Sequence, residues 1–264
     1  MFATSAVAPT VRRAEHLAML IDRRLFLIAP ALLSACATPP PPPTRVLVIA
    51  VLHGAHRMNP NYTYDHLYAR IRAFAPTAVG VEVRQEDLER SQAYVAANYP
   101  QEMGALAVEY DAIVSGIDWL GEDLVGREVP AGYWANENEI KRLERALAAD
   151  PNDPTKNDPE LETIGAAQMP LVRTGSASEM NDGRYDALTR RRYARLGELL
   201  RGTPYQPMTD FYAARDAHID ANAVALIRAN PGGRVALVVG ADHRFALIDA
   251  IAAAFGPAVE FEPV

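Results

Sequence analysis

The chain has 264 residues, of which 49% are hydrophobic and 22% are charged, and its formal net charge at pH 7 is −7. This composition is that of an ordinary globular protein, and the length suits one domain of a little over 200 residues once the N-terminus is set aside. The acidic balance argues against binding to nucleic-acid phosphates. A single cysteine excludes an intrachain disulfide framework and a cysteine-rich zinc site.

The first 35 residues have the layout of an export signal. Arg23 and Arg24 form a basic pair, residues 25–33 form an apolar run, and small residues precede Cys36. The run is too short to span a bilayer, so the pattern predicts a cleaved signal and not a membrane helix. Met19 offers a second start that would give a conventionally short signal. The arginine pair leaves both a general and a twin-arginine export route open.

Residues 33–36, Leu-Ser-Ala-Cys, resemble the bacterial lipobox, in which the cysteine is acylated and becomes the first residue of the mature chain. The alternative is an ordinary cleavage site with an incidental cysteine. Cys36 is the chain's one cysteine and stands where the motif needs it, so we expect lipidation there and an anchor on the periplasmic side of a bacterial cell envelope. The prolines at 39–43 predict a stiff spacer, so residues 36–44 would tether the domain to the membrane.

From residue 45 onward, short continuous apolar runs alternate with longer amphipathic stretches. Such runs predict buried strands, and helical spacing of apolar residues predicts the helices that cover them. The order of elements predicts one α/β domain over residues 45–264, with a mostly parallel central sheet flanked by helices. The predicted strands are 45–52, 78–83, 113–117, 235–239 and 259–261, and the predicted helices are 62–74, 86–110, 136–149, 185–200, 208–229 and 245–254.

Two stretches interrupt this alternation. Pro100 lies inside the helical pattern of residues 86–110, which leaves a break in that helix open. Residues 150–182 are rich in Asp, Asn, Pro, Thr, Ser and Gly, so we expect a loop-rich excursion there.

Ionisable residues stand at the ends of four predicted strands. His53 follows the first strand, Glu82 lies near the end of the second, Asp118 follows the third and His243 follows the fourth. The carboxyl ends of parallel strands meet at one edge of a sheet, where ligands gather, so we expect these four side chains to converge. His53, Glu82 and His243 would either bind a divalent metal (Mn, Co or Zn) or act without metal as general acid and base.

Each of these residues also has a structural alternative. A single histidine at a strand end is more often structural than a ligand, and Asp118 could cap a helix or form a turn. Glu82 could form an ion pair with Arg84 or Arg72. The constellation is more specific than its members, because chance would have to place four such residues at the same kind of position.

The residues around the last strand add detail to this candidate site. Gly240, in residues 240–243 (Gly-Ala-Asp-His), lets the chain turn sharply and pass close to a ligand. His243 then starts the next helix near its positive end, which disfavours a cation and predicts a neutral imidazole. On the helix at 208–229, Arg215, His218 and Asn222 recur at spacings that place them on one face.

These motifs resemble the TraB/Tiki/erythromycin-esterase superfamily, which includes the haem-binding ChaN lipoproteins. Its members share a strand ending in GxxH, a strand-end glutamate, a helix with an Arg-Asp or Arg-Asn pair, and a second GxxH. The second motif is intact at residues 240–243, the glutamate corresponds to Glu82, and the helix pair corresponds to Arg215-Asp216, with Asn222 two turns on. The resemblance spans residues 45–250 and looks nearest to the small bacterial families of unknown function.

The first motif departs from the family pattern. Ala50 stands where the family has glycine, and Gly54 and His56 follow His53. We expect His53 to face the site, although the altered motif leaves His56 as an alternative.

The resemblance implies a different activity for each branch: metal-dependent proteolysis in Tiki proteins, macrolactone opening in erythromycin esterases and haem binding in ChaN proteins. We expect a lipid-anchored periplasmic hydrolase that acts on ester or peptide bonds of a small molecule or peptide. The candidate catalytic residues are His53, Glu82, Asp118, Arg215 and His243, of which Arg215 would stabilise an oxyanion or a substrate carboxylate. The candidate substrate-binding residues are His56, Asn222, Gly240 and Asp242.

Two rival hypotheses stay open. A lipoprotein that binds haem or another small ligand is supported by the Tyr- and His-containing residues 61–66, because both side chains can ligate haem iron. A degenerate, non-catalytic member of the superfamily is supported by Ala50 in place of the motif glycine.

Overall fold

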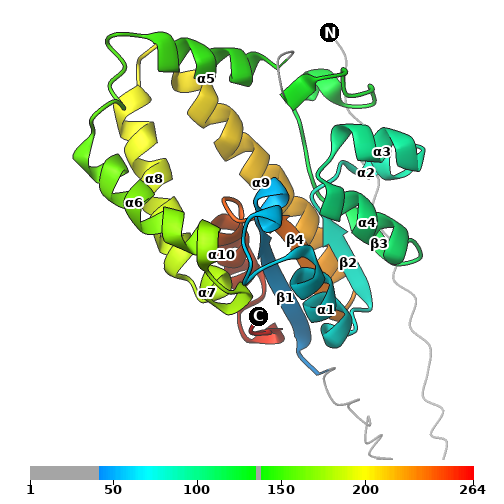
Figure 1. The fold of residues 1–264 in the computed structure, drawn as a ribbon. Coiled ribbons are helices and arrows are strands. Elements are labelled where there is room, and N and C mark those ends of the chain that lie inside the picture. Colours follow the sequence, from blue (N-terminus) through cyan, green and yellow to red (C-terminus); the bar gives the residue numbers. More distant parts are fainter. Residues whose placement is uncertain (1–41, 135–137) are drawn as a thin grey trace, which may run out of the picture. The chain divides into compact units, whose positions relative to one another are not determined.

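The computed structural model describes residues 42–134 and 138–264, which form one compact unit with a central sheet between layers of helices (Figure 1). All neighbouring strands are parallel, in the order β3-β2-β4-β1-β5. The α/β fold that the sequence predicts is therefore confirmed. The strands are β1 (Thr44–Val51), β2 (Ala78–Val81), β3 (Val114–Gly116), β4 (Arg234–Gly240) and β5 (Val259–Phe261).

The predicted export signal, the lipidation site Cys36 and the first part of the tether lie outside the described residues. In the part of the chain that is described, no helix has the length and apolar character needed to cross a membrane. The helices are α1 (Tyr64–Phe74), α2 (Gln85–Leu88), α3 (Gln92–Asn98), α4 (Gln101–Glu109), α5 (Glu139–Ala149), α6 (Pro159–Thr174), α7 (Ala177–Asn181), α8 (Arg184–Leu200), α9 (Gln206–Arg228) and α10 (Arg244–Phe255). Short 3-10 turns are η1 (His53–Arg57), η2 (Glu122–Leu124) and η4 (Gly256–Ala258).

The sheet has an apolar core on each face, because successive strand residues point to opposite sides. Leu47 and Ile49 of β1 belong to the core that includes α1 and α4. Val46 and Val48 belong to the core that includes α9 and α10. Full burial of both faces explains why β1 and β4 are continuously apolar in sequence.

Two helix boundaries follow from local sequence. The break left open at Pro100 is confirmed, since α3 ends at Asn98 and Pro100 is the N-cap of α4. The expectation of a loop-rich stretch over 150–182 is wrong, because α6 and α7 occupy much of it. Asp158 caps α6 by accepting from the Leu161 N–H, and proline at the first helical position also suits a helix start. The polar residues that resembled a loop are in part helix caps.

The carboxyl ends of the strands form the functional edge of this fold. Figure 1 shows α5 and the first turns of α9 on the side toward which the strand arrows point. Parallel pairing of β1 with β4, and of β2 with both β3 and β4, brings the residues after these strands to one edge. The predicted convergence of strand-end side chains thus has the required topology.

Candidate functional site

Arg215 of α9 lies at the centre of a buried cluster of charged side chains. Its Nε and one Nη donate to the two carboxylate oxygens of Asp118 at 2.8 and 2.9 Å, and the same Nη donates to Glu82 at 2.7 Å. The other Nη lies 3.1 Å from His243 Nε2. All four side chains are at most 7% exposed. The structure therefore brings together four of the five predicted catalytic residues around one guanidinium.

Glu82 is held as an anion in this cluster. Its second carboxylate oxygen accepts from the Gly240 N–H. Burial opposes the charge, but the nearby charges of His243 and Arg215 outweigh it and lower the pKa of Glu82 to about 2. A carboxylate of such low basicity is suited to holding Arg215 in place and not to abstracting a proton.

His243 forms a closed pair with Asp216. Its Nδ1 lies 2.5 Å from the Asp216 carboxylate, and its Nε2 accepts from Arg215, because a guanidinium can only donate. Accepting from Arg215 requires the neutral imidazole that we expected at the start of α10. Burial and the Arg215 charge oppose a charge on the ring, while the Glu82 and Asp216 carboxylates favour it and raise the pKa of His243.

His53 forms a second histidine–carboxylate pair, and this one is open. Its Nδ1 lies 2.7 Å from Oε1 of Glu102 on α4, so Nδ1 carries the proton that the carboxylate accepts. The Glu102 side chain is fully buried, whereas the His53 side chain is 37% exposed. Nε2 of His53 makes no hydrogen bond to the described residues. Burial opposes the charge on His53, but the Glu102 bond and the Glu82 charge raise its pKa.

The backbone at His53 is also unusual. His53 has a φ of 46°, in the left-handed region that residues other than glycine seldom adopt. Such a conformation costs on the order of 1 kcal/mol or more and is common at functional sites. It turns the chain sharply off β1 and places the imidazole at the edge of the sheet.

Gly240 keeps the centre of the site open. A methyl group at this position would lie 2.7 Å from His53 Nε2, 3.2 Å from Glu82 Oε2 and 3.5 Å from His243 Cδ2. The three groups thus converge on one small space, which only a glycine leaves free. Sequence analysis assigned Gly240 to substrate binding, and its placement agrees with that role.

Two cavities meet at this space and share His53, Glu82 and Arg215 in their linings. The larger has a volume of about 530 Å³ and the smaller about 250 Å³. The larger is also lined by Ala97, Asn98, Tyr99, Pro100, Asp118, Gly132, Tyr133, Trp134, Lys141 and Tyr212. The smaller is also lined by Val51, Leu52, Val172, Tyr185, Gly240, Ala241, Asp242 and His243. A substrate could place one half in each cavity, with the bond to be cleaved beside His53.

The predicted metal ligands are largely engaged by other groups in this arrangement. His243 Nε2 has one lone pair, which accepts from Arg215, whereas each carboxylate oxygen of Glu82 accepts one hydrogen bond, from Arg215 or from Gly240, and keeps a second lone pair. A metal ion bound to Glu82 would therefore lie beside the Arg215 cation, and among the described residues His53 Nε2 is the predicted ligand atom that has no hydrogen bond. Within residues 42–134 and 138–264, no group of three or more His, Cys, Asp and Glu side chains has metal-binding geometry.

His56, the alternative to His53, is placed away from both cavities. Its Nε2 accepts from the Leu52 N–H at 2.9 Å and its Nδ1 lies 2.6 Å from the Tyr62 carbonyl oxygen. Burial lowers its pKa. With both ring nitrogens bonded to the backbone, His56 holds the turn after β1 and has no atom left for a substrate.

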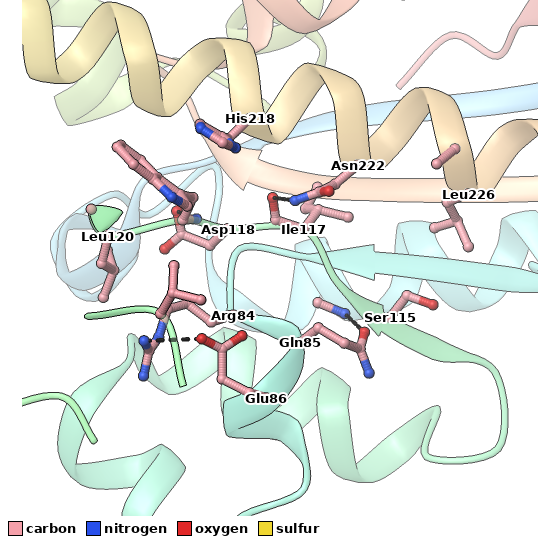
Figure 2. A pocket seen from close by; sticks show the side chains of 15 residues that line it. Arg84, Gln85, Glu86, Ser115, Ile117, Asp118, Leu120, His218, Asn222 and Leu226 are labelled. Atoms are coloured by element: carbon pink, nitrogen blue, oxygen red, sulfur yellow. Dashed lines mark hydrogen bonds and ion pairs between the residues drawn. The ribbon is translucent and has the colours of Figure 1, made fainter. Parts of the chain in front are cut away.

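Asn222 is likewise outside the two cavities. It lines a third cavity of about 420 Å³ beside β3, where its Nδ2 donates to the Ile117 carbonyl at 3.1 Å (Figure 2). His218 lines the same cavity and stacks on Trp119, with ring centroids 4.3 Å apart. The helix face shared by these three residues therefore contributes to different cavities. Arg215 lines the two cavities at His53, and His218 and Asn222 line the cavity beside β3.

Asp242 lines the smaller cavity, but its carboxylate has partners. It accepts from the Tyr185 hydroxyl at 3.1 Å and forms an ion pair with Arg192 at 2.5 Å. This placement agrees with the predicted substrate-binding role. Asp242 would offer a substrate a polar surface whose charge is already paired with Arg192.

Sequence analysis missed Glu102. Its side chain points inward with Met103 and Leu106 of α4, both fully buried. A carboxylate on the apolar face of a helix is costly unless it has a partner, and this was the signal that could have found it.

The residues that supported a haem site have hydrogen-bond partners within the protein. Tyr62 is fully buried and donates to the Ala50 carbonyl at 2.7 Å, and Tyr64 donates to the His53 carbonyl at 3.0 Å. His66 belongs to the capping box of α1. Each of these side chains has a structural partner, and none lines the two cavities at His53.

Comparison with protein-family models, with curated proteins and with solved structures finds no match to this chain. The resemblance to the TraB/Tiki/erythromycin-esterase superfamily stays a prediction, carried by the short motifs alone.

Proposed function

We propose that this protein is a hydrolase of ester or amide bonds in which His53 is the general base and no metal is required. The observation that carries the proposal is the open pair of His53 and Glu102. A buried carboxylate fixes Nδ1–H, while Nε2 has no hydrogen bond to any described residue, and His53 lines both cavities. This is the arrangement that general-base catalysis needs.

In the proposed reaction, His53 Nε2 removes a proton from a water molecule as its oxygen attacks the substrate carbonyl. Glu102 stabilises the imidazolium that forms, through the Nδ1–H bond. The carbonyl oxygen becomes an oxyanion in the tetrahedral intermediate. When the bond to the leaving group breaks, the imidazolium returns its proton to the leaving alcohol or amine, and His53 is neutral again.

Arg215 can supply the donor for the oxyanion. A guanidinium has five N–H groups, and the bonds to Asp118, Glu82 and His243 use four of them. One Nη–H remains, and Arg215 lines both cavities. A fixed donor at a developing negative charge contributes about 100- to 1000-fold in rate. Glu82 and Asp118 hold Arg215 in position, and Asp216 holds His243.

The test is a hydrolysis screen of the purified chain over neutral esters, amides and short peptides, with metal analysis of the same sample. We expect activity that survives a chelator and falls at least a hundredfold in His53→Asn. Asn suits the left-handed backbone at this position. His66→Asn, at an exposed histidine outside the site, is the matched control. A stoichiometric metal whose removal abolishes activity would support the metal-dependent alternative, and a haem absorption band would support the binding protein.

We also propose the lipid anchor on Cys36 and the periplasmic location, which rest on the sequence of residues 23–43. Labelling cells with a fatty-acid analogue should mark the wild-type protein and not Cys36→Ser. If both proteins are labelled equally, or neither is, the anchor proposal fails while the hydrolase proposal stands.

A further inference from the structure

The larger cavity is walled by aromatic rings from three parts of the chain. Tyr99 follows α3, Tyr133 and Trp134 precede α5, and Tyr212 belongs to α9. The tyrosine hydroxyls are all used inside the protein: Tyr99 donates to Asp87, Tyr133 to the Leu120 carbonyl at 2.9 Å and Tyr212 to Glu144 at 2.9 Å. These bonds fix the rings, so the tyrosines can offer a ligand their carbon surface but not a free hydroxyl proton.

Each charged side chain in the described part of this lining has an oppositely charged partner. Glu82 and Asp118 are both bonded to Arg215, and the Lys141 ammonium lies 2.7 Å from Glu144. His53 is paired with Glu102. Because two carboxylates share the one Arg215 cation, an anionic ligand would meet an excess of negative charge in a partly dehydrated cavity, which is costly.

Trp134 lies between this aromatic wall and the reacting groups. The Arg215 guanidinium carbon is 5.1 Å from the centre of its ring, and the Tyr133 ring meets it edge-on at 5.2 Å. These contacts hold the indole beside the proposed oxyanion donor. A flat ring stacked on Trp134 would thus be close to the bond that His53 acts on.

The smaller cavity sets the size of the other half of the substrate. It has about half the volume of the larger one, and the carboxylates in its described lining, Asp242 and Glu82, are already paired with Arg192 and Arg215. The two cavities differ in both size and aromatic content, so they would hold the two halves of a substrate in one orientation.

Resting on the proposed hydrolase function, we infer that the substrate is an ester or amide without a negative charge, with an aromatic group on one side of the scissile bond and a small group on the other. The aromatic group occupies the larger cavity against Trp134. The small group occupies the cavity beside Asp242.

Binding can be tested apart from turnover by calorimetry on the full chain carrying His53→Asn, here and in the tryptophan variants below, so that the amides are not hydrolysed. The three probes are of similar shape: phenylacetamide, cyclohexylacetamide and phenylacetate. We expect phenylacetamide to bind about threefold to tenfold more tightly than cyclohexylacetamide, which is the usual range for an aromatic pair. We expect the phenylacetate anion to bind more weakly still. Equal binding of the two amides, or tighter binding of the anion, would overturn the inference.

The two tryptophans of the chain provide matched variants. Trp134→Leu should lose the preference for the aromatic amide, whereas Trp119→Leu, in the separate cavity beside β3, should keep it. In Trp119→Phe, the remaining indole should change its fluorescence when phenylacetamide is added. Loss of the preference in both leucine variants, or in neither, would contradict the assignment to the larger cavity. Thermal melting of each variant checks that it is folded.

Hydrolysis of ethyl phenylacetate and ethyl cyclohexylacetate separates this inference from the proposed function. Binding with an aromatic preference but no hydrolysis of any ester or amide would refute the hydrolase and keep the aromatic ligand class. Hydrolysis without an aromatic preference would refute the inference and keep the hydrolase. The absence of both would refute both.

Discussion

Two histidine–carboxylate pairs stand at the ends of neighbouring strands, and they differ in exposure and in the second ring nitrogen. His53 with Glu102, after β1, is 37% exposed, and its second nitrogen has no hydrogen bond to the described residues. His243 with Asp216, after β4, is 7% exposed and has its second nitrogen on Arg215. An imidazole and a carboxylate therefore form an open pair suited to proton transfer in one place and a closed pair suited to holding the cluster together in the other. The second ring nitrogen is what distinguishes the roles.

Exchange of each histidine for asparagine should give the largest contrast between the pairs. His243→Asn removes one partner from a buried charge cluster, which typically costs about 3 to 5 kcal/mol of unfolding free energy. His53→Asn should cost less, about 1 to 3 kcal/mol, because Asn tolerates the backbone conformation but the buried Glu102 carboxylate loses its histidine partner. Urea unfolding of both variants measures the difference. Equal losses would mean that the open pair is structural too.

Gly240→Ala tests the space between the two pairs. The added methyl would lie 2.7 Å from His53 Nε2, where the attacking water has to bind. Because His53 is partly exposed and can move aside, we expect a loss of activity of about a hundredfold or more with little loss of stability. An active Gly240→Ala protein would place the reaction somewhere else.

Glu102→Gln should change how the activity of the open pair depends on pH. His53 acts as a base when it is neutral, so activity rises with pH through its pKa, which Glu102 and Glu82 raise and Arg215 opposes. Removal of the Glu102 charge lowers that pKa, so the midpoint of the rise in kcat/KM should move to lower pH. The maximum value of kcat/KM should fall about tenfold. An unchanged midpoint would show that Glu102 does not act on His53.

Asp220→Asn should give the smallest effect, beside the closed pair. Burial and the Asp216 charge raise the pKa of Asp220 from 3.8 to about 7. The folded protein therefore holds this proton more tightly than the unfolded chain, and stability falls as pH rises through that range. Asn cannot ionise, so Asp220→Asn avoids this loss of stability at high pH. Its free energy of unfolding should exceed that of the wild type by about 1 to 2 kcal/mol at pH 8, allowing for partial exposure. At pH 4 the two proteins should unfold alike.

The sequence predicted best where burial left a strong pattern. The apolar runs of β1 and β4 could be recognised because both faces of the sheet are covered, and the polar residues after them followed from parallel topology. This logic placed His53, Glu82, Asp118 and His243 at one edge. Arg215 was found because its charge stood out on a helix that also carries apolar residues.

The rest depended on contacts that no short pattern encodes. Glu102 lies 49 positions from His53, and its pairing requires α4 to pack beside the turn after β1. His56 resembled a site residue until its two backbone bonds were known. α6 was missed because its stability comes in part from packing against α8, whereas its composition resembles a loop.

The central cation of the cluster is a side chain. Arg215 joins Glu82, Asp118 and His243 in the way that a bound ion would, but it is connected to the chain by covalent bonds. The positive charge is therefore complete as soon as the chain has folded, at any external metal concentration. It can be neither exchanged for a competing ion nor withdrawn by another protein. In the proposed hydrolase, the charge that holds these groups together is thus supplied by the chain itself.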